Sequence, residues 1–282
     1  VDTTVRAMRQ ALSTGGIQPK EIAAIGITNQ RETTLIWDRK TGQAIHRAIV
    51  WQCRRTAPII ERLKQDGLTE MIRDKTGLVP DAYFSASKIR WLLDQTGAQA
   101  RAERGELCFG TVDSFLAWHL TGGQTHVTDA TNAARTMLFN LKEQDWDDDL
   151  LRVFNIPRAL LPQVKDTAGV IGTLDERCLG QAIPIAALAG DQHAALFGQG
   201  CLEEGAVKNT YGTGCFMLMN TGARPVRDER GLLTTMAWRL NGKPMYALEG
   251  SVFVAGAAIQ WLRDELGVIG TAAQSRELPV PY

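Results

Sequence analysis

Two short apolar runs, each followed directly by polar residues, constrain the fold most strongly. Residues 22–28 (IAAIGIT) and 184–190 (PIAALAG) are nearly continuous apolar segments, which is typical of strands buried on both faces of a sheet. Ligands in α/β proteins bind where such strands end. The two runs therefore indicate an α/β fold, and the residues that follow them are the first candidates for a functional site.

The segments around the first run predict helices and a hairpin. Helical spacing of apolar residues begins at Val5 and is stopped by Gly15-Gly16. The segments 33–38 and 44–51 flank the turn signal Lys40-Thr41-Gly42 and predict a β-hairpin. Further helices are predicted over residues 56–65, 85–95 and 113–120.

The pattern changes near Gly200. Residues 208–222, 231–242 and 243–250 predict successive strands joined by glycine turns. The segment 252–266 (VFVAGAAIQWLRDEL) predicts a helix with apolar residues on most faces, so we expect that helix to be buried. This change indicates two α/β domains, residues 1–199 and residues 200–282.

Charge and cysteine usage narrow the class of protein. The chain has 31 basic and 31 acidic residues and a formal net charge of zero, so there is no broad basic field for nucleic acid or anionic lipid. No apolar run approaches the length of roughly 20 residues that spans a bilayer, and the first residues do not resemble a signal peptide. The five cysteines are scattered and lack a Cys-x-x-Cys pair, which favours a reducing cytosol.

An acidic run raises the question of a metal site. Asp147, Asp148 and Asp149 are consecutive, and carboxylates are metal ligands. Acids in the first turn of a helix also complement the helix dipole, and Pro157 follows where such a helix would end. We prefer the helix interpretation. The four histidines show no metal-ligand spacing, so no residue is assigned to a metal.

Charged residues follow both apolar runs. Arg31 and Glu32 come just after the first, where a cation and an anion can hydrogen-bond a polyol from opposite sides, although adjacent charges are commonly just solvated. Asp191 directly follows the second and precedes a helical stretch. It could accept the proton of an attacking hydroxyl, cap that helix, or do both.

A glycine turn and three aromatic residues are weaker candidates. The sequence 211–214 (YGTG) joins two predicted strands, where glycines let the backbone approach an anion and the threonine hydroxyl can donate to it. In isolation an ordinary hairpin turn is the more common explanation. Trp51, Tyr83 and Phe216 lie near these loops, and their spacing alone does not choose between core and ligand wall.

Taken together, these segments resemble the FGGY family of carbohydrate kinases. The resemblance runs in order through nearly the whole chain, and NQRETT, VWQCRRTA and NTYGTGCFM are similar to the branch that phosphorylates glycerol with ATP. It implies an α/β fold of the actin-like, ribonuclease-H-like kind, with two domains closing on a cleft, and a homo-oligomer, dimer or tetramer, of the full-length protein. The first domain would bind glycerol and the second would bind the nucleotide.

The resemblance also implies roles for individual residues. Asp191 matches the catalytic base. The other substrate-binding matches are Arg31, Glu32, Tyr83 and Gln192 for the hydroxyls of glycerol, and Trp51 and Phe216 for the apolar walls. The matches to nucleotide contacts are Gly212, Thr213, Gly256 and Gln260.

Three departures from the family pattern create further expectations. The family's first phosphate-gripping loop, with an aspartate that helps to place Mg²⁺, would precede Val1, and its later adenosine-binding segment would follow Tyr282. We therefore expect that the chain is cut short at both ends and that it is inactive when expressed as given. Residues 176–184 (ERCLGQAIP) lack the loop that binds an inhibitory sugar bisphosphate in some bacterial members, so that regulation is not expected.

Two other functions remain open at this stage. One is a kinase of the same family that acts on a pentulose, although a site walled by Trp51 and Phe216 offers little room for a larger substrate. The other is a non-catalytic relative that binds glycerol. A panel of substrates would distinguish a pentulose kinase from a glycerol kinase. The coding sequence upstream of Val1 would distinguish a non-catalytic relative from an active kinase.

Overall fold

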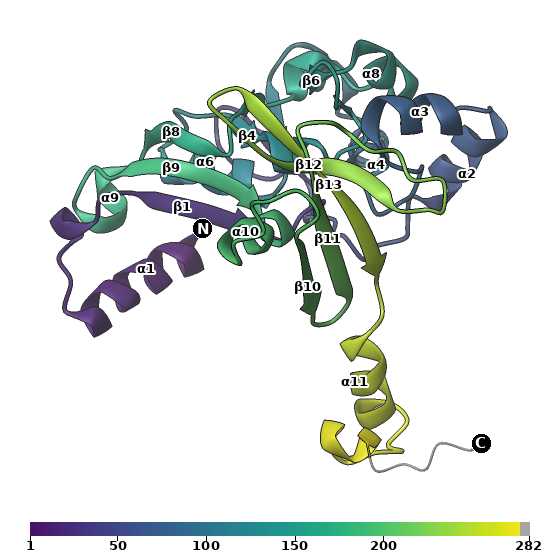
Figure 1. Ribbon diagram of the computed structural model, residues 1–282. Helices are drawn as coiled ribbons and strands as arrows, with labels where there is room; N and C mark the ends of the chain where they lie inside the picture. Colours follow the sequence, from purple (N-terminus) through teal and green to yellow (C-terminus); the bar gives the residue numbers. More distant parts are fainter. Residues whose placement is uncertain (277–282) are drawn as a thin grey trace.

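The computed structural model describes residues 1–276. Its first sheet has three strands, which Figure 1 draws beside α1 (Asp2–Gly15). β9 (Pro184–Gly190) is central: it pairs in parallel with β1 (Ile25–Asn29) and antiparallel with β8 (Ala168–Thr173). The register places Asn29 opposite Gly190. The two predicted strands are therefore neighbours that end at the same edge of the sheet.

The prediction that the first strand is buried on both faces is wrong. Ile27 packs into a core with Leu120 and Leu188, but Gly26 and Thr28 are exposed. They line an apolar groove of about 450 Å³ beside α1 (Asp2–Gly15), none of whose residues is buried. An apolar run predicts a strand, but the exposed fraction of its side chains depends on which neighbouring elements pack against it.

The predicted hairpin is also not regular. β2 (Leu35–Asp38) pairs antiparallel with β3 (Leu107–Gly110), and the segment 44–51 makes only isolated bridges to the first arm. The Asp38 carboxylate accepts hydrogen bonds from the amides of Lys40 (2.9 Å) and Thr41 (2.7 Å) and closes the turn. The regular partner of β2 is therefore β3, and the second arm of the predicted hairpin is irregular backbone.

The largest core gathers around these strands and two of the predicted helices, α2 (Ala57–Gln65) and α4 (Ser85–Thr96). The third predicted helix, α6 (Val112–Leu120), packs through Ala117 and Leu120 into the core that holds Ile27 and Leu188. The shorter elements are η1 (Pro19–Glu21), α3 (Thr69–Thr76), α5 (Gln99–Glu103), β4 (Val127–Asp129), α7 (Ala130–Ala133), β5 (Phe139–Asn140), β6 (Asp145–Trp146), α8 (Asp148–Phe154), η2 (Arg158–Leu160), β7 (Gln163–Lys165) and α9 (Glu176–Leu179).

The acidic run begins α8, as the helix interpretation predicts. Asp147 is the N-cap residue, and its side chain accepts hydrogen bonds from the amides of Asp149 and Leu150 at 3.0 Å. Lys75 Nζ lies 2.7 Å from carboxylate oxygens of both Asp147 and Asp149. The carboxylates of Asp147 and Asp149 are therefore stabilised by the N-terminus of α8 and by Lys75.

A second sheet follows α10 (Asp191–Gly198). Its four strands are antiparallel in the order β10 (Val207–Tyr211), β11 (Cys215–Gly222), β13 (Lys243–Val252) and β12 (Leu233–Leu240). The predicted succession of strands is confirmed. The β10–β11 hairpin lies beside α10, so the glycine turn is carried by an element that contacts the helix following Asp191 (Figure 1).

The last helix differs from its prediction. α11 (Gly256–Asp264) is shorter than expected and projects from the body of the molecule, with none of its residues buried and Trp261 about half exposed (Figure 1). Within residues 1–276 it packs on the short η3 (Ala272–Arg276). None of the helices described is long and apolar enough to cross a membrane. Residues 277–282 of the predicted second domain lie outside the described residues.

A buried carboxylate in the first turn of α6 carries a prediction about pH. Asp113 is fully buried and accepts hydrogen bonds from the hydroxyls of Thr111 and Thr128, the latter at 2.7 Å. Burial, reinforced by the nearby carboxylate of Asp129, raises the pKa of Asp113 to about 6. The native state therefore binds the Asp113 proton more tightly than the unfolded chain does.

We expect Asp113→Asn to remove part of the pH dependence of stability. Relative to the variant, the wild-type protein is most stable below the unfolded pKa of about 4 and loses that advantage as the pH rises through about 6. A shift of roughly two pKa units corresponds to a change of about 3 kcal/mol in the difference between the two proteins. Urea unfolding at pH 4, 5, 6 and 7 measures it, and a constant difference would contradict the prediction.

Candidate active site

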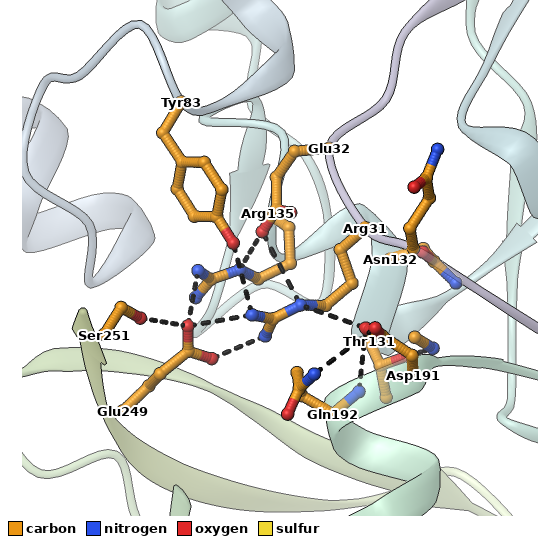
Figure 2. Close-up of polar contacts among 12 residues, drawn as sticks. Arg31, Glu32, Tyr83, Thr131, Asn132, Arg135, Asp191, Gln192, Glu249 and Ser251 are labelled. Atoms are coloured by element: carbon orange, nitrogen blue, oxygen red, sulfur yellow. Dashed lines mark hydrogen bonds and ion pairs between the residues drawn. The ribbon is translucent and has the colours of Figure 1, made fainter. Parts of the chain in front are cut away.

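The parallel pairing of β1 and β9 brings the predicted site together. Arg31 lies two residues beyond the end of β1, and Asp191 directly follows β9. The Thr33 amide donates to the Arg31 carbonyl at 2.7 Å, and Glu32 has a φ of 59°, a left-handed conformation that is uncommon outside glycine. After this tight turn, the Arg31 guanidinium points toward Glu249 and the Glu32 carboxylate toward Arg135 (Figure 2).

All seven residues predicted to bind substrate line one small pocket. The pocket has a volume of about 50 Å³. Trp51 comes from a turn before α2, Tyr83 from the turn before α4, and Phe216 from β11. The full lining is Gln30, Arg31, Glu32, Trp51, Tyr83, Asp191, Gln192 and Phe216.

A buried network of four charges forms the floor of this region (Figure 2). Arg31 forms a bidentate ion pair with Glu249, in which Nη2 donates to Oε1 at 2.9 Å. Arg135 donates to Glu32 Oε1 at 2.7 Å and to Glu249 Oε1 at 2.9 Å. Each of the four residues is at most 2% exposed. Two cations and two anions compensate one another, as buried charges must.

The network fixes protonation states. Burial opposes ionisation of Glu249, but the guanidinium groups of Arg135 and Arg31 hold its pKa well below its usual range. Burial, with the charge of Glu32, raises the pKa of Tyr83 far above its ordinary value. Glu249 therefore stays ionised, and Tyr83 keeps its hydroxyl proton near neutral pH.

Asp191 differs from the buried acids because its side chain is 44% exposed. Its Oδ1 lies 3.8 Å from Arg31 Nε and accepts a hydrogen bond from the Gln192 amide at 2.9 Å. Gly190 occupies the N-cap position of α10, and Asp191 is the first helical residue. The interpretation of Asp191 as the helix cap is therefore wrong, and its carboxylate is open to the pocket.

Two lysines that the sequence analysis did not single out donate hydrogen bonds to residues that line the pocket. Lys88 Nζ donates to the carbonyls of Tyr83 (2.6 Å) and Glu32 (3.1 Å). Lys208 Nζ donates to Gln192 Oε1 and to the Phe216 carbonyl, the latter at 3.1 Å. Burial lowers the pKa of each lysine to about 8. These ammonium groups hold the backbone and side chains that line the pocket.

The predicted nucleotide-binding residues form a second group. The Gly256 amide donates to the Gly212 carbonyl at 3.0 Å, so α11 begins against the glycine turn. A Cβ on Gly256 would lie 2.5 Å from that carbonyl, so only glycine fits there. Among the described residues, the amides of Thr213 and Gly214 donate to no protein acceptor. Gln260 lies one turn further along α11 and is exposed.

Arg135 and Glu249 were missed by the sequence analysis, although each carries a recognisable signal. Both are single charges inside otherwise apolar segments, AARTM and YALEG. A charge in such a segment is either a surface residue or a member of a buried pair. The sequence does not tell which, because the partners are 103 to 218 positions away along the chain.

The fold and the site define a class of protein. The FGGY family of carbohydrate kinases matches through its N-terminal domain over residues 1–198 and through its C-terminal domain over residues 207–279. The chain belongs to this family. The expected fold class, an α/β fold of the actin-like, ribonuclease-H-like kind, is confirmed.

Individual relatives narrow the comparison further. The chain is 57% identical over 278 residues to glycerol kinase 2 of Thermotoga maritima and 61% identical over 270 residues to the glycerol kinase of Natranaerobius thermophilus. These matches cover 98% and 95% of this chain but 56% and 54% of the relatives. The chain thus spans about half the length of the curated relatives it matches.

Solved structures agree on the fold. The Plasmodium falciparum glycerol kinase with ADP superimposes with a TM-score of 0.84 at 37% identity, covering 91% of this chain and 51% of that one. A xylulose kinase from Lactobacillus acidophilus gives a TM-score of 0.77 at 22% identity, with 91% and 51% covered. The second comparison shows a common fold and does not bear on the substrate.

Proposed function

We propose that the complete gene product transfers the γ-phosphoryl group of ATP to glycerol and forms sn-glycerol 3-phosphate. The observation that carries the proposal is the set of open polar atoms in the small pocket. Among the described contacts, Arg31 Nε and Glu32 Oε2 make no hydrogen bond, and Asp191 presents an exposed carboxylate beside them. One donor and two acceptors suit a small polyol. The identity of 57–61% to proteins named glycerol kinase supports the same substrate.

The size of the pocket favours glycerol over a sugar. A water molecule needs roughly 10–15 Å³ of such space, so about 50 Å³ holds a few hydroxyl-sized groups. Trp51 and Phe216 pack edge to face, with ring centroids 5.9 Å apart, and together close one side of the pocket. A pentulose has two more carbons and two more oxygens to accommodate.

The residues around the pocket can orient glycerol for an in-line transfer. Arg31 and Glu32 would bind two hydroxyls, and the terminal hydroxyl would donate a hydrogen bond to Asp191. Phosphoryl transfer passes through a loose transition state, so positioning and charge neutralisation supply most of the catalysis. A carboxylate is a weak base for an alcohol. Asp191 therefore orients the hydroxyl early and accepts its proton late in the transfer.

The nucleotide would lie on the glycine turn. Among the described residues the amides of Thr213 and Gly214 donate to no protein acceptor, so they would offer two donors to a phosphate oxygen. Mg²⁺ in such sites is bound through phosphates and one or two carboxylates. Residues 1–276 hold no cluster of three or more potential metal ligands, and Asp191 is the exposed carboxylate of the pocket that could contribute to Mg²⁺ binding. Bound Mg²⁺ would neutralise charge on the transferred group.

Several wider expectations accompany this proposal. Residues 1–199 would form the glycerol-binding domain, and residues 200–282 would belong to the nucleotide-binding domain. A homo-oligomer of the complete gene product, a dimer or a tetramer, remains a prediction, and a cytosolic location fits the scattered cysteines. Size-exclusion chromatography with light scattering measures the oligomeric state.

The proposal is tested by identifying the product. The complete gene product is incubated with glycerol, ATP and Mg²⁺, and ³¹P NMR is used to follow the phosphate esters formed. We expect a glycerol 3-phosphate resonance that grows with time and requires glycerol. Binding of glycerol by calorimetry with no phosphorylated product would instead support the non-catalytic alternative.

A further inference from the structure

A second cavity lies directly behind the small pocket. Its volume is about 440 Å³, and its lining includes Phe253 and Val254 from the junction between β13 and α11. Trp51 and Tyr83 line both this cavity and the small pocket. These two side chains are therefore the wall between a tight polar pocket and a larger, mainly apolar space.

The two halves of this wall are held differently. Tyr83 is 3% exposed, its amide donates to Asp81 at 2.7 Å, and its carbonyl accepts from Lys88 at 2.6 Å. Trp51 is only partly buried and lies in a turn. Ring contacts hold its indole, with centroid distances of 5.9 Å to Tyr83 and 6.3 Å to Phe253. Trp51 can thus be shortened without removing a polar anchor of the pocket.

The neighbouring aromatic wall, Phe216, does not line the second cavity. Phe216 is 8% exposed and lies in β11, which pairs with a strand on each side. The Arg31 guanidinium lies 5.8 Å from the ring centroid of Phe216, and the Phe216 carbonyl accepts a hydrogen bond from Lys208. Removing this ring would enlarge the small pocket itself and would not open it into the second cavity.

We propose that Trp51 is the residue that limits the size of the polyol, and that its removal joins the two cavities. This inference rests on the proposed function of the small pocket. Glycerol carrying a short apolar or aromatic ether on one terminal oxygen would then bind with its diol in the pocket and its ether group in the cavity.

The chemistry of the cavity selects this class of ligand. Tyr83, Phe253 and Val254 present apolar surface, which stabilises a buried aromatic group. The charged residues of the lining, Arg54 and Asp81, form an ion pair with each other.

The test compares two substrates in three forms of the complete gene product. The substrates are glycerol and 3-phenoxypropane-1,2-diol, and the forms are wild type, Trp51→Ala and the matched control Phe216→Ala. We expect wild type to favour glycerol, Trp51→Ala to raise kcat/KM for the ether by about tenfold or more, and Phe216→Ala to lower glycerol turnover without this gain. Trp51→Leu replaces the alanine variant if that variant does not fold.

The outcomes separate this inference from the proposed function. An equal gain for Phe216→Ala, no gain for Trp51→Ala, or efficient use of the ether by wild type would overturn the role of Trp51 while glycerol phosphorylation stands. If wild type does not phosphorylate glycerol, the proposed function fails, and calorimetry of ether binding decides the inference. Tighter ether binding by Trp51→Ala than by wild type supports the joined cavities, and equal or weaker binding refutes them.

Discussion

Asp191→Asn in the complete gene product is expected to reduce kcat for glycerol phosphorylation by about a hundredfold or more, the usual scale for a lost general base. Asn keeps the shape of the side chain but cannot accept the hydroxyl proton. The Michaelis constant for glycerol should change much less, because Arg31 and Glu32 retain their contacts. Steady-state kinetics with glycerol as the varied substrate measure both parameters.

The position of Asp191 makes this experiment informative. The residue is the first of α10 and is not its cap, and Asn keeps an oxygen that can accept the hydrogen bond from the Gln192 amide. We expect the variant to unfold in urea at nearly the wild-type midpoint. Wild-type turnover in a folded variant would show that Asp191 only orients Gln192 and that another group accepts the proton.

Glu249→Gln should have the largest effect on stability. Glu249 is the partner of both Arg31 and Arg135 and is fully buried. Neutralising it leaves two buried guanidinium groups with Glu32 as their one carboxylate partner in the network. Breaking one partner of a buried charge pair typically costs about 3–5 kcal/mol. Urea unfolding measures this loss, and a raised KM for glycerol should accompany it because Arg31 loses its orientation.

A charge-balanced double variant separates the charge imbalance from simple loss of packing. Arg135→Gln combined with Glu249→Gln leaves Arg31 and Glu32 as a neutral pair. We expect the double variant to be less destabilised than the sum of the two single variants, because the two residues interact directly. The exposed Glu61 pairs with Lys64, and Glu61→Gln is the matched surface control, expected to change stability by less than about 1 kcal/mol. Equal effects of Glu249→Gln and Glu61→Gln would contradict the network.

The arrangement of the site follows from the sequence only in part. Arg31 and Asp191 follow apolar strands, and parallel strands end at one edge of a sheet, so their proximity is predictable from local pattern. The turn at Glu32 with its positive φ, and the pairing of Arg31 with Glu249, depend on how β13 lies against the loop after β1. No local propensity encodes a contact over 218 positions.

The wrong predictions about the fold have the same origin. The run 22–28 and the helix around Trp261 are apolar, but β1 has one open face and α11 is exposed. Apolar composition predicts burial only when another element covers the surface. The regular partner of β2 is β3, about 70 residues later, and the segment 44–51 makes only isolated bridges to the first arm of the predicted hairpin. Periodicity identifies strands and helices, whereas tertiary contacts choose their partners.

Substrate preference tests the central claim most directly. The measurement is kcat/KM of the complete gene product for glycerol and for D-xylulose under the same concentrations of ATP and Mg²⁺. A pocket of about 50 Å³ with one open donor and the carboxylates of Glu32 and Asp191 predicts a preference for glycerol of about a hundredfold or more. Comparable values, or a preference for D-xylulose, would contradict the assignment of glycerol and would favour a pentulose kinase.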